Sequence, residues 1–499
     1  MEGDNGISMS ITITDRSVEA KIWARTVDVR FGVILVFGYS PPHIEALLAR
    51  RNDLELLCLD PDSFQSSDDN RVRIFHTLQD IQGAIQINTL KRRGLSAVSM
   101  AQSRVDYAAL YEEWLTWIKN LAIAVRVDLL TGLRFAREWT RNVILNMKWL
   151  PQSASVVDSF DEWTGLPAAI ISAGPSLEEA LPALRQYGDR MLTIAVGSTI
   201  PVLFRAGIEP DLIAGFDGGL NHWRGHFRGL RITAPLIYDP IIHPWVLDEH
   251  AGPKIVMNCW GFDWYADLVG MKLGKVAVGP SIANSALKAA IAMGANPIFL
   301  IGQDLAFRNG RFHAPNVHLS GVPVALPDSR MTVAGVSQES VETSLTMYTF
   351  LKHFEHTLRK FPTTEVINVN GTAKIEGTLD RRLSQVPGRL NKIEGISLIS
   401  LEKKRMKGKL LGGCACDDVE RLRGYFRAVL DVALQIRDRA DVLDLKNAVR
   451  ARQMSPLAFL LSPILTDPRI ESDPTWMVRR VRSAIDYAVP YLQQTLEEI

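Results

Sequence analysis

The sequence predicts an α/β protein. Its core is a doubly wound, mostly parallel sheet, preceded by a small N-terminal α/β domain and followed by a helical C-terminal domain. Between residues 168 and 304, short apolar runs alternate with helix-forming segments joined by short turns, as in parallel strands connected by helices. The runs are nearly continuous in apolar residues, as expected for strands covered on both faces. From about residue 412 the pattern is helical and charged to the end.

The N-terminal part begins with a strand, turn, helix and strand over residues 32–64. The break lies at residues 38–42 and the second strand ends at Asp60. This is a βαβ unit of Rossmann type without the G-x-G-x-x-G fingerprint. Helical spacing follows from residue 100 to 149, and residues 150–167 are typical of a linker. We therefore assign residues 1–150 to a Rossmann-like domain with trailing helices, 151–395 to a central domain and 396–499 to a helical domain.

The central domain contains six apolar runs that predict buried strands. They cover residues 168–173, 191–196, 212–217, 235–239, 254–259 and 297–304. Helices are expected after Ser176, after Ser198, and over residues 282–294 and 340–360. Residues 305–337 form a long segment with few helix signals and a turn pair at Asn309-Gly310, which is typical of a functional lid.

Two turns share the sequence Gly-Pro-Ser, at residues 174–176 and 279–281. Gly174 and Gly279 allow unusual dihedrals and a close approach of a ligand to the backbone. Ser176 and Ser281 are expected helix N-caps, and Glu179 would complete a capping box with Ser176. The N–H groups and dipole of such a helix end can hold an anion. Since every α/β protein needs turns of this kind, one Gly-Pro-Ser alone favours a purely structural role.

A row of small polar or acidic residues follows the apolar runs: Ser176, Ser198, Asp217, Asp239, Ser281, Gln303 and Asp304. They should meet at the carboxyl edge of the sheet, where open α/β sheets bind ligands. Roughly half are expected only to cap helices, but the whole row predicts a polar ligand such as a sugar nucleotide. Glu178 and Glu179 in the first helix repel phosphate, whereas the second helix has no charge before Lys288. The second turn is therefore the expected phosphate cradle and the first suits a ribose or base.

Composition excludes several classes of protein. The 499 residues are 47% hydrophobic with a net charge of +1, which gives no electrostatic footprint for nucleic acid. No uncharged apolar run is long enough for a membrane span, and the first ten residues do not resemble a signal peptide. Four cysteines make no disulfide scaffold, and Cys414-x-Cys416 lacks two further ligands for zinc. We expect a cytoplasmic protein.

Four stretches together make a more specific pattern: "IISAGPSLEEAL", "AGIEPDLIAGFD", "VGPSIANSALKAAIAMGANPIFLIGQDLAFRNGRFHA" and "INVNGTAKIEG". They resemble the motility-associated factor family of bacterial glycosyltransferases, whose superfamily includes 6-hydroxymethylpterin diphosphokinase-like proteins. The similarity covers roughly residues 165–377. It implies a central glycosyltransferase domain, similar to that of bacterial sialyltransferases, that binds a nucleotide sugar.

The resemblance also implies a reaction. A nonulosonic acid of the pseudaminic or legionaminic type would be moved from a CMP-activated donor to serine or threonine of flagellin, as flagellum assembly and motility require. Flagellin and the CMP-nonulosonic acid are then the partners, without nucleic acid. No cofactor is expected to be required, and a divalent metal stays open.

The same resemblance implies site residues. For binding the nucleotide sugar it carries over Gly174, Pro175, Ser176, Ser281 and Gly302. The turn and the polar row described above and the loop charges add Gly279, Ser198, Gln303 and Arg308 to that binding site. Those assigned to catalysis are Asp217, Asp304 and His313. A histidine suits the base that takes the acceptor's proton, with His313 first and His318 behind it. Arg308 and Arg311 could neutralise phosphate charge.

The chain departs from the sialyltransferase pattern in two places. Ala173 stands where those enzymes have Asn, so one nucleotide contact is missing. Residues 305–307 read Leu-Ala-Phe where those enzymes place aromatic hydroxyls for the leaving phosphate. A tyrosine-assisted departure is therefore not expected at these positions.

Two other functions compete. One is a diphosphokinase that uses ATP and Mg²⁺, with Asp217, Asp239 and Asp304 as metal ligands; the extra N- and C-terminal parts argue against it. The other is a non-catalytic flagellin-binding assembly factor, against which the intact turns argue only weakly.

The stretch "NHWRGHFRG" at residues 221–229 interleaves basic, aromatic and histidine residues. It would suit an acceptor protein or a sugar carboxylate, and equally a rim loop with an amphipathic anchor.

Overall fold

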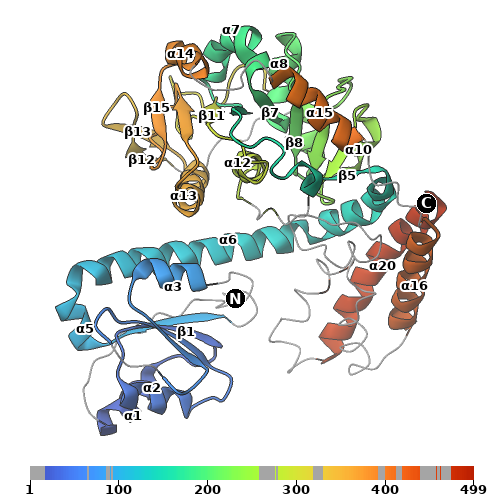
Figure 1. The fold of residues 1–499 in the computed structure, drawn as a ribbon. Helices are drawn as coiled ribbons and strands as arrows, with labels where there is room; N and C mark the ends of the chain where they lie inside the picture. Colours follow the sequence, from blue (N-terminus) through green and yellow to red (C-terminus); the bar gives the residue numbers. More distant parts are fainter. Residues whose placement is uncertain are drawn as a thin grey trace. The chain divides into compact units, whose positions relative to one another are not determined.

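The computed structural model describes residues 17–63, 67–85, 90, 94–257, 276, 279–317, 330–391, 399–411, 419–438, 457, 461 and 474–498. The chain forms two compact units, Met1–Phe135 and Ala136–Ile499, coloured along the sequence in Figure 1.

The first unit contains a four-stranded parallel sheet in the order β3-β2-β1-β4. Its strands are β1 (Val33–Phe37), β2 (Glu55–Leu59), β3 (Val72–Phe75) and β4 (Leu95–Ser99). Its helices are α1 (Ser17–Thr26), α2 (Pro41–Leu48), α3 (Leu78–Ala84), α5 (Ala101–Asp106) and the start of α6 (Ala108–Asn146). Alternate residues of β1 enter two cores: Ile34 packs with Trp23, and Leu35 with Trp114. The predicted βαβ unit is confirmed as β1, α2 and β2.

The second unit contains a nine-stranded sheet in the order β15-β14-β11-β6-β7-β8-β9-β10-β5. All neighbouring strands run parallel, which confirms the predicted fold class. The strands are β5 (Ala154–Ser155), β6 (Ala168–Ile171), β7 (Leu192–Val196), β8 (Leu212–Gly215), β9 (Leu236–Tyr238), β10 (Lys254–Val256), β11 (Ile298–Ile301), β14 (Val366–Val369) and β15 (Leu379–Arg381).

The helices of this unit connect the strands or pack beside them. They are α7 (Leu177–Tyr187), α8 (Ile200–Arg205), α9 (Leu220–His226), α10 (Pro244–Glu249), α12 (Ile282–Ala292), α13 (Leu345–Lys360), α14 (Val386–Leu390), α15 (Ile399–Leu411), α16 (Val419–Asp438) and α20 (Pro474–Glu498). Figure 1 shows α16 and α20 as a pair, and the two helices pack against each other. The helical C-terminal region predicted from the sequence is therefore present.

One predicted helix starts too early. Residues 340–343 form strand β13 (Ser340–Thr343), antiparallel to β12 (Met331–Ala334), and α13 begins only at Leu345. Val341 and Thr343 are buried while Ser340 and Glu342 are exposed, which is the two-residue period of a strand. Ser344 then caps α13 by accepting the N–H of Met347.

The chain enters the large sheet at the edge strand β5 and continues at β6 in its interior, and from β6 onward the strand order reverses direction once. From β6 the chain adds β7, β8, β9 and β10 on one side, and then crosses to β11, β14 and β15 on the other side. The topological switch point therefore lies between β6 and β11. Ligands of open α/β sheets bind outside the carboxyl ends of the two strands at such a point.

Two segments near the predicted domain boundaries pack with the sheet of the second unit. Asn142 and Asn146, at the end of α6, donate to the carbonyls of Gly218 and Pro240. On α15, Lys403 lies 2.6 Å from Asp211, and Met406 is buried in the sheet's core. The predicted domain boundaries at residues 150 and 395 stay a prediction.

Candidate functional site

Asp304 and Ser176 meet across the switch point. Asp304 follows β11 and Ser176 follows β6. The backbone N–H and the hydroxyl of Ser176 both donate to Asp304 Oδ2, each at 2.8 Å. Thr372, which follows β14, donates to Asp304 Oδ1 at 2.5 Å. Both side chains of the pair are buried, so the Asp304 carboxylate joins the ends of three neighbouring strands.

Two glycines allow this close approach. Gly174 N–H donates to Gly302 O at 2.8 Å. A Cβ at Gly174 would overlap Gly302 O and the Asp304 carboxylate, and a Cβ at Gly302 would overlap Ser172 O. Gly302 also has φ +69°, which side chains rarely adopt. The backbones after β6 and β11 therefore approach each other closely at the switch point. At Gly174 the close neighbours are Gly302 and Asp304, and its φ is not positive, so the ligand approach expected there stays a prediction.

The predicted capping box at Ser176 is wrong. Ser176 has helical dihedrals and its side chain caps no N–H of α7, because the hydroxyl donates to Asp304 instead. Glu179 turns outward to Arg308, with contacts of 2.9 and 3.0 Å, and accepts from Asn370 Nδ2 at 3.3 Å. Arg308, predicted to neutralise phosphate, thus holds the charge of Glu179 in this structure.

Arg308 and His313 lie on one hairpin. Arg308 and Arg311 exchange backbone hydrogen bonds around Asn309 and Gly310, both of positive φ. Ala314 N–H then donates to Ala173 O at the end of β6, at 2.8 Å. His313 is half-buried, 4.6 Å from the ring of Phe312 and one residue from this contact. The structure therefore brings His313 to the first Gly-Pro-Ser turn, while His318 lies outside the described residues.

The second turn is capped as predicted. Ser281 Oγ accepts from Asn284 N at 3.2 Å and donates to Asn284 Oδ1 at 2.8 Å. Gly279 N–H donates to Ser285 Oγ, and a Cβ at Gly279 would overlap the side chain of Asn284. Because α12 leads directly into β11, its amino end lies at the same carboxyl edge as Ser176.

The remaining predicted residues are spread along that edge. Gln303 accepts from Ser172 Oγ at 2.6 Å beside the switch point. Ser198 is half-buried in a short 3-10 turn after β7. Asp217, after β8, is exposed and accepts from Gly219 N. Asp239, after β9, is buried and accepts from Ile241 N. The structure thus brings Ser176, Gln303 and Asp304 together, but not Asp217 and Asp239 with them.

This spacing bears on a metal site. Three strand intervals separate β8 from β11, which is roughly 14 Å. This separation of the strand ends argues against Asp217 and Asp304 coordinating one ion. Within the described ranges, no three His, Cys, Asp or Glu side chains gather in a way that could hold a metal.

Two functional candidates were not singled out from the sequence. Thr372 and Asn370 lie in "NVNGT" after β14, and both bind the switch-point residues. The signal was the same as for Ser176 and Asp304, since small polar residues directly follow an apolar run. What the run does not reveal is that β14 lies next to β11.

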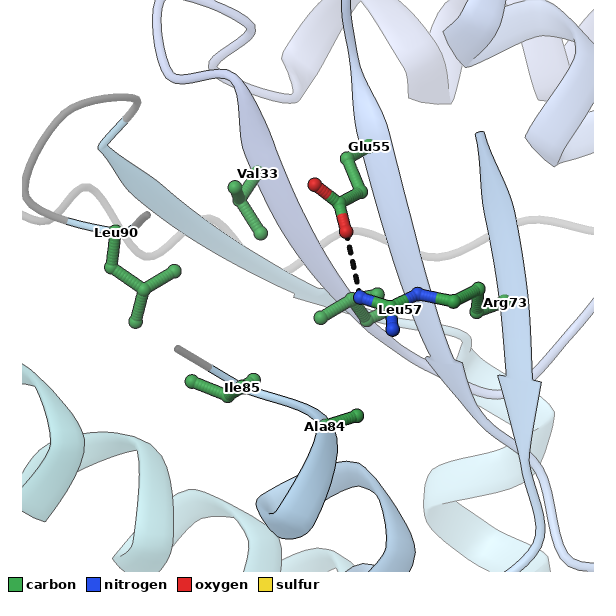
Figure 2. A pocket seen from close by; sticks show the side chains of 7 residues that line it. All are labelled: Val33, Glu55, Leu57, Arg73, Ala84, Ile85 and Leu90. Atoms are coloured by element: carbon green, nitrogen blue, oxygen red, sulfur yellow. Dashed lines mark hydrogen bonds and ion pairs between the residues drawn. The ribbon is translucent and has the colours of Figure 1, made fainter. Parts of the chain in front are cut away.

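A cavity of about 200 Å³ lies in the first unit. Figure 2 shows Val33 and Leu57 on its sheet side, Ala84 and Ile85 at the end of α3, and the 2.7 Å ion pair between Glu55 and Arg73. Val33 and Glu55 are the first residues of β1 and β2. The cavity therefore lies at the amino ends of the strands, where ligands of such sheets do not usually bind.

The fold and the switch-point turns define a class of α/β proteins, and comparison with known proteins agrees. Residues 140–310 match the family model described as 6-hydroxymethylpterin diphosphokinase MptE-like. An uncharacterized protein of Treponema pallidum (strain Nichols) is 26% identical over 109 residues, which are 22% of this chain and 51% of that protein. The match thus spans about half the length of this curated relative.

Among solved structures, a MAf glycosyltransferase from Magnetospirillum magneticum AMB-1 is similar over the whole fold. The TM-score is 0.55 at 17% sequence identity, covering 99% of this chain and 86% of that chain. Over residues 140–310 the family model agrees with the superfamily resemblance inferred from the sequence, and the structural likeness confirms the fold. None of the helices in the described ranges has a stretch long and apolar enough to cross a bilayer.

Proposed function

We propose that this protein is a glycosyltransferase that moves a nonulosonic acid from its CMP form to serine or threonine of flagellin. The reaction takes place in the cytoplasm, before flagellin is exported, and serves flagellum assembly and motility. The observation that carries the proposal is the close approach of the backbone at Gly174 and Gly302, at the switch point of a fold shared with a MAf glycosyltransferase. Such a point is where this sheet type binds nucleotides.

The two Gly-Pro-Ser turns, at residues 174–176 and 279–281, bind different parts of the nucleotide in this proposal. In the first turn, the N–H groups of Gly174 and Ser176 already donate to Gly302 and Asp304. This turn therefore presents surface for a ribose or base. Ser281 begins a helix of 11 residues with no acidic residue in its first turn, so its amino end takes the phosphate. When its guanidinium separates from Glu179, Arg308 neutralises the charge of the departing phosphate.

His313 is the base in this scheme. The hydroxyl oxygen of the acceptor forms a bond to the anomeric carbon of the sugar, and His313 takes the hydroxyl proton. The bond between that carbon and the phosphate oxygen breaks, and its electron pair leaves with CMP. Asp304 positions the first turn through Ser176. Asp217, which is exposed at the carboxyl edge of the sheet, remains a candidate catalytic residue. The scheme needs no cofactor, and a metal is not required by any step.

The mass of flagellin tests the proposal in cells. We expect the flagellin glycan to be lost when the gene is deleted and when it encodes His313→Gln. His76→Gln is the matched control, because His76 is exposed and lies in the first unit. Flagellin of unchanged mass in the deletion strain would exclude the proposal. Flagellin that binds the protein yet never changes mass would favour a non-catalytic assembly factor.

The second candidate is a diphosphokinase, favoured by the name of the family model that matches residues 140–310. It needs Mg²⁺ to bridge the phosphates of ATP. The roughly 14 Å between the strand ends that bear Asp217 and Asp304 argues against the metal site expected for it. Tight binding of ATP with Mg²⁺ and none of CMP would favour this candidate.

A further inference from the structure

An aromatic cluster lies on α9, α10 and the loop before α10, after the carboxyl ends of β8 and β9. Trp223 and Trp245 pack edge to face with ring centroids 4.6 Å apart. His243 lies 5.1 Å from Trp245 and stacks at 6.3 Å on Trp223. The nucleotide turns do not use any of these rings, so the cluster needs its own explanation.

Trp245 is exposed but firmly held. It is 46% exposed, its backbone N–H donates to His243 Nδ1 at 3.4 Å, and its ring has aromatic neighbours on two elements. A large apolar ring kept in water costs free energy that burial would recover. A rigid, exposed indole is typical of recognition sites, because it offers contact area with little loss of side-chain entropy.

Two buried polar atoms here lack partners within the described ranges, one in the cluster and one on the neighbouring His222, whose ring packs on His226 and Phe227. Among the described residues, neither Trp223 Nε1 nor His222 Nε2 has a hydrogen-bond partner, and the two side chains are 7% and 5% exposed. The His222 ring fits only because residue 197 is glycine, since a Cβ there would lie 2.7 Å from Cε1. Leaving a buried polar group unsatisfied is unfavourable, so such groups usually mark a place where a ligand or water completes the bond.

The charged groups that act on these residues are Arg141, Arg224, Arg228, Asp217 and Asp248, and the excess of arginine favours an anionic ligand. Arg224 and Arg228 are exposed on either side, and the Arg228 guanidinium lies 5.4 Å over the Trp223 ring. Burial is the main cause that lowers the pKa of His222, and it lowers the pKa of His243 to about 4. Both imidazoles are therefore neutral at pH 7. His243 Nδ1 already accepts from Trp245 N–H, so its other ring nitrogen can donate to a ligand, whereas His222 Nε2 can exchange one hydrogen bond with it. Arginine is the residue that pairs most specifically with a carboxylate.

We propose that this cluster of Trp223, His243 and Trp245, together with His222 and Arg224, is a carbohydrate subsite for the carboxylated sugar ring of the donor. The inference rests on the proposed function. The apolar face of the ring packs on Trp245, its hydroxyls satisfy Trp223 and His222, and its carboxylate pairs with Arg224. The subsite is two to three strand intervals from β6, roughly 10–14 Å along the edge. A sugar joined to a nucleotide bridges that span.

Calorimetric titration with CMP, CMP-N-acetylneuraminic acid and CMP-pseudaminic acid tests the subsite. In the wild type we expect at least one sugar nucleotide to bind more tightly than CMP. Trp245→Ala should weaken that sugar nucleotide about tenfold and leave CMP within twofold. Trp245→Phe, which keeps a smaller ring, should lose less.

Phe204→Ala is the matched control. Phe204 is 54% exposed in the last turn of α8, which runs back toward the amino edge of the sheet. We expect it to change neither affinity. Thermal unfolding of each variant shows that the fold is kept.

The outcomes separate the two proposals. If CMP and its sugar forms bind but Trp245→Ala affects them equally or not at all, the carbohydrate subsite is wrong and the proposed function stands. If no sugar nucleotide binds more tightly than CMP, the subsite is also wrong. If no CMP compound binds at all, the proposed function fails and the subsite with it.

Discussion

Asp304 accepts both the backbone N–H and the hydroxyl of Ser176 on one carboxylate oxygen, across 128 residues of sequence. This bond pair ties the end of β6 to the end of β11 at the switch point. It gives Asp304 a positioning role, because the carboxylate holds the first turn rather than facing open solvent. Nucleotide binding and stability should therefore both depend on it.

Asp304→Asn should destabilise the second unit. An amide can present only one oxygen, so at least one of the three donors from Ser176 and Thr372 loses its acceptor. The free energy of unfolding should fall by about 2 kcal/mol or more, measured by urea denaturation. Asp217→Asn, at an exposed position, is the control and should change it by less than about 0.5 kcal/mol. Equal midpoints for Asp304→Asn and the wild type would refute the positioning role.

Gly302→Ala should cost more than Gly207→Ala. Both glycines have nearly the same positive φ, +69° and +65°, so both variants incur about 1 kcal/mol of backbone strain. Only at Gly302 does the new Cβ overlap another residue, Ser172, while Gly207 has nothing within 4 Å. The difference should be about 1–3 kcal/mol in urea unfolding. Equal free energies of unfolding for the two variants would contradict the close contact between Gly302 and Ser172.

Glu179→Gln should strengthen the binding of the nucleotide phosphate. The change removes the nearer of the two carboxylates that pair with Arg308, Glu179 at 2.9 Å, and leaves Asp304 at 3.9 Å, so the guanidinium becomes more available to an anion. We expect CMP affinity to rise a few-fold, with a steeper dependence on salt. Glu178→Gln makes the same change in net charge one residue away and should have a smaller effect. If both variants respond equally, Arg308 has no specific part in holding phosphate.

His353 should make stability fall as the solution is acidified. When the His353 ring is neutral, its Nε2 accepts a hydrogen bond from the Lys288 ammonium at 2.8 Å. Burial first, and then the charge of Lys288, lower the pKa of His353 to about 3, against about 6.5 in the unfolded chain. The folded state thus binds the proton less readily. The stabilisation is fully present above pH 6.5 and is lost as the pH falls toward 3.

His353→Gln tests this pH dependence because the amide oxygen can still accept from Lys288. The wild type should lose up to about 1.4 kcal/mol per pH unit more than the variant below pH 6. Urea unfolding at pH 7.5, 6 and 5 measures the difference, with His76→Gln as the exposed control. Parallel stability curves for wild type and His353→Gln would contradict the depressed pKa.

The order of elements could be predicted from local pattern, and the pairing across the sheet could not. The apolar runs before Ser176 and after Asn296 read correctly as buried strands, and Ser281 was correctly expected to cap its helix. At Ser176 the same reasoning failed. A capping box is decided within four residues, whereas Asp304 comes from a strand 128 residues away that lies beside β6.

Similar limits apply at the other site residues. Arg308 looked available for phosphate because Glu179 is remote in sequence, yet the hairpin at Asn309-Gly310 brings them together. The sequence showed that a polar residue follows each strand, but not how far apart these residues lie along the edge of the sheet. Only the strand order shows that Asp217 lies about three intervals from Asp304.

The most direct test of the central claim is a calorimetric titration of the purified full chain with CMP and with ATP plus Mg²⁺, repeated on Gly302→Ala. We predict that CMP binds the wild type, that ATP with Mg²⁺ binds at least tenfold more weakly, and that Gly302→Ala loses CMP binding while Gly207→Ala keeps it. Selective binding of ATP with Mg²⁺, or CMP binding unchanged in Gly302→Ala, would contradict a CMP-sugar site at the switch point between β6 and β11.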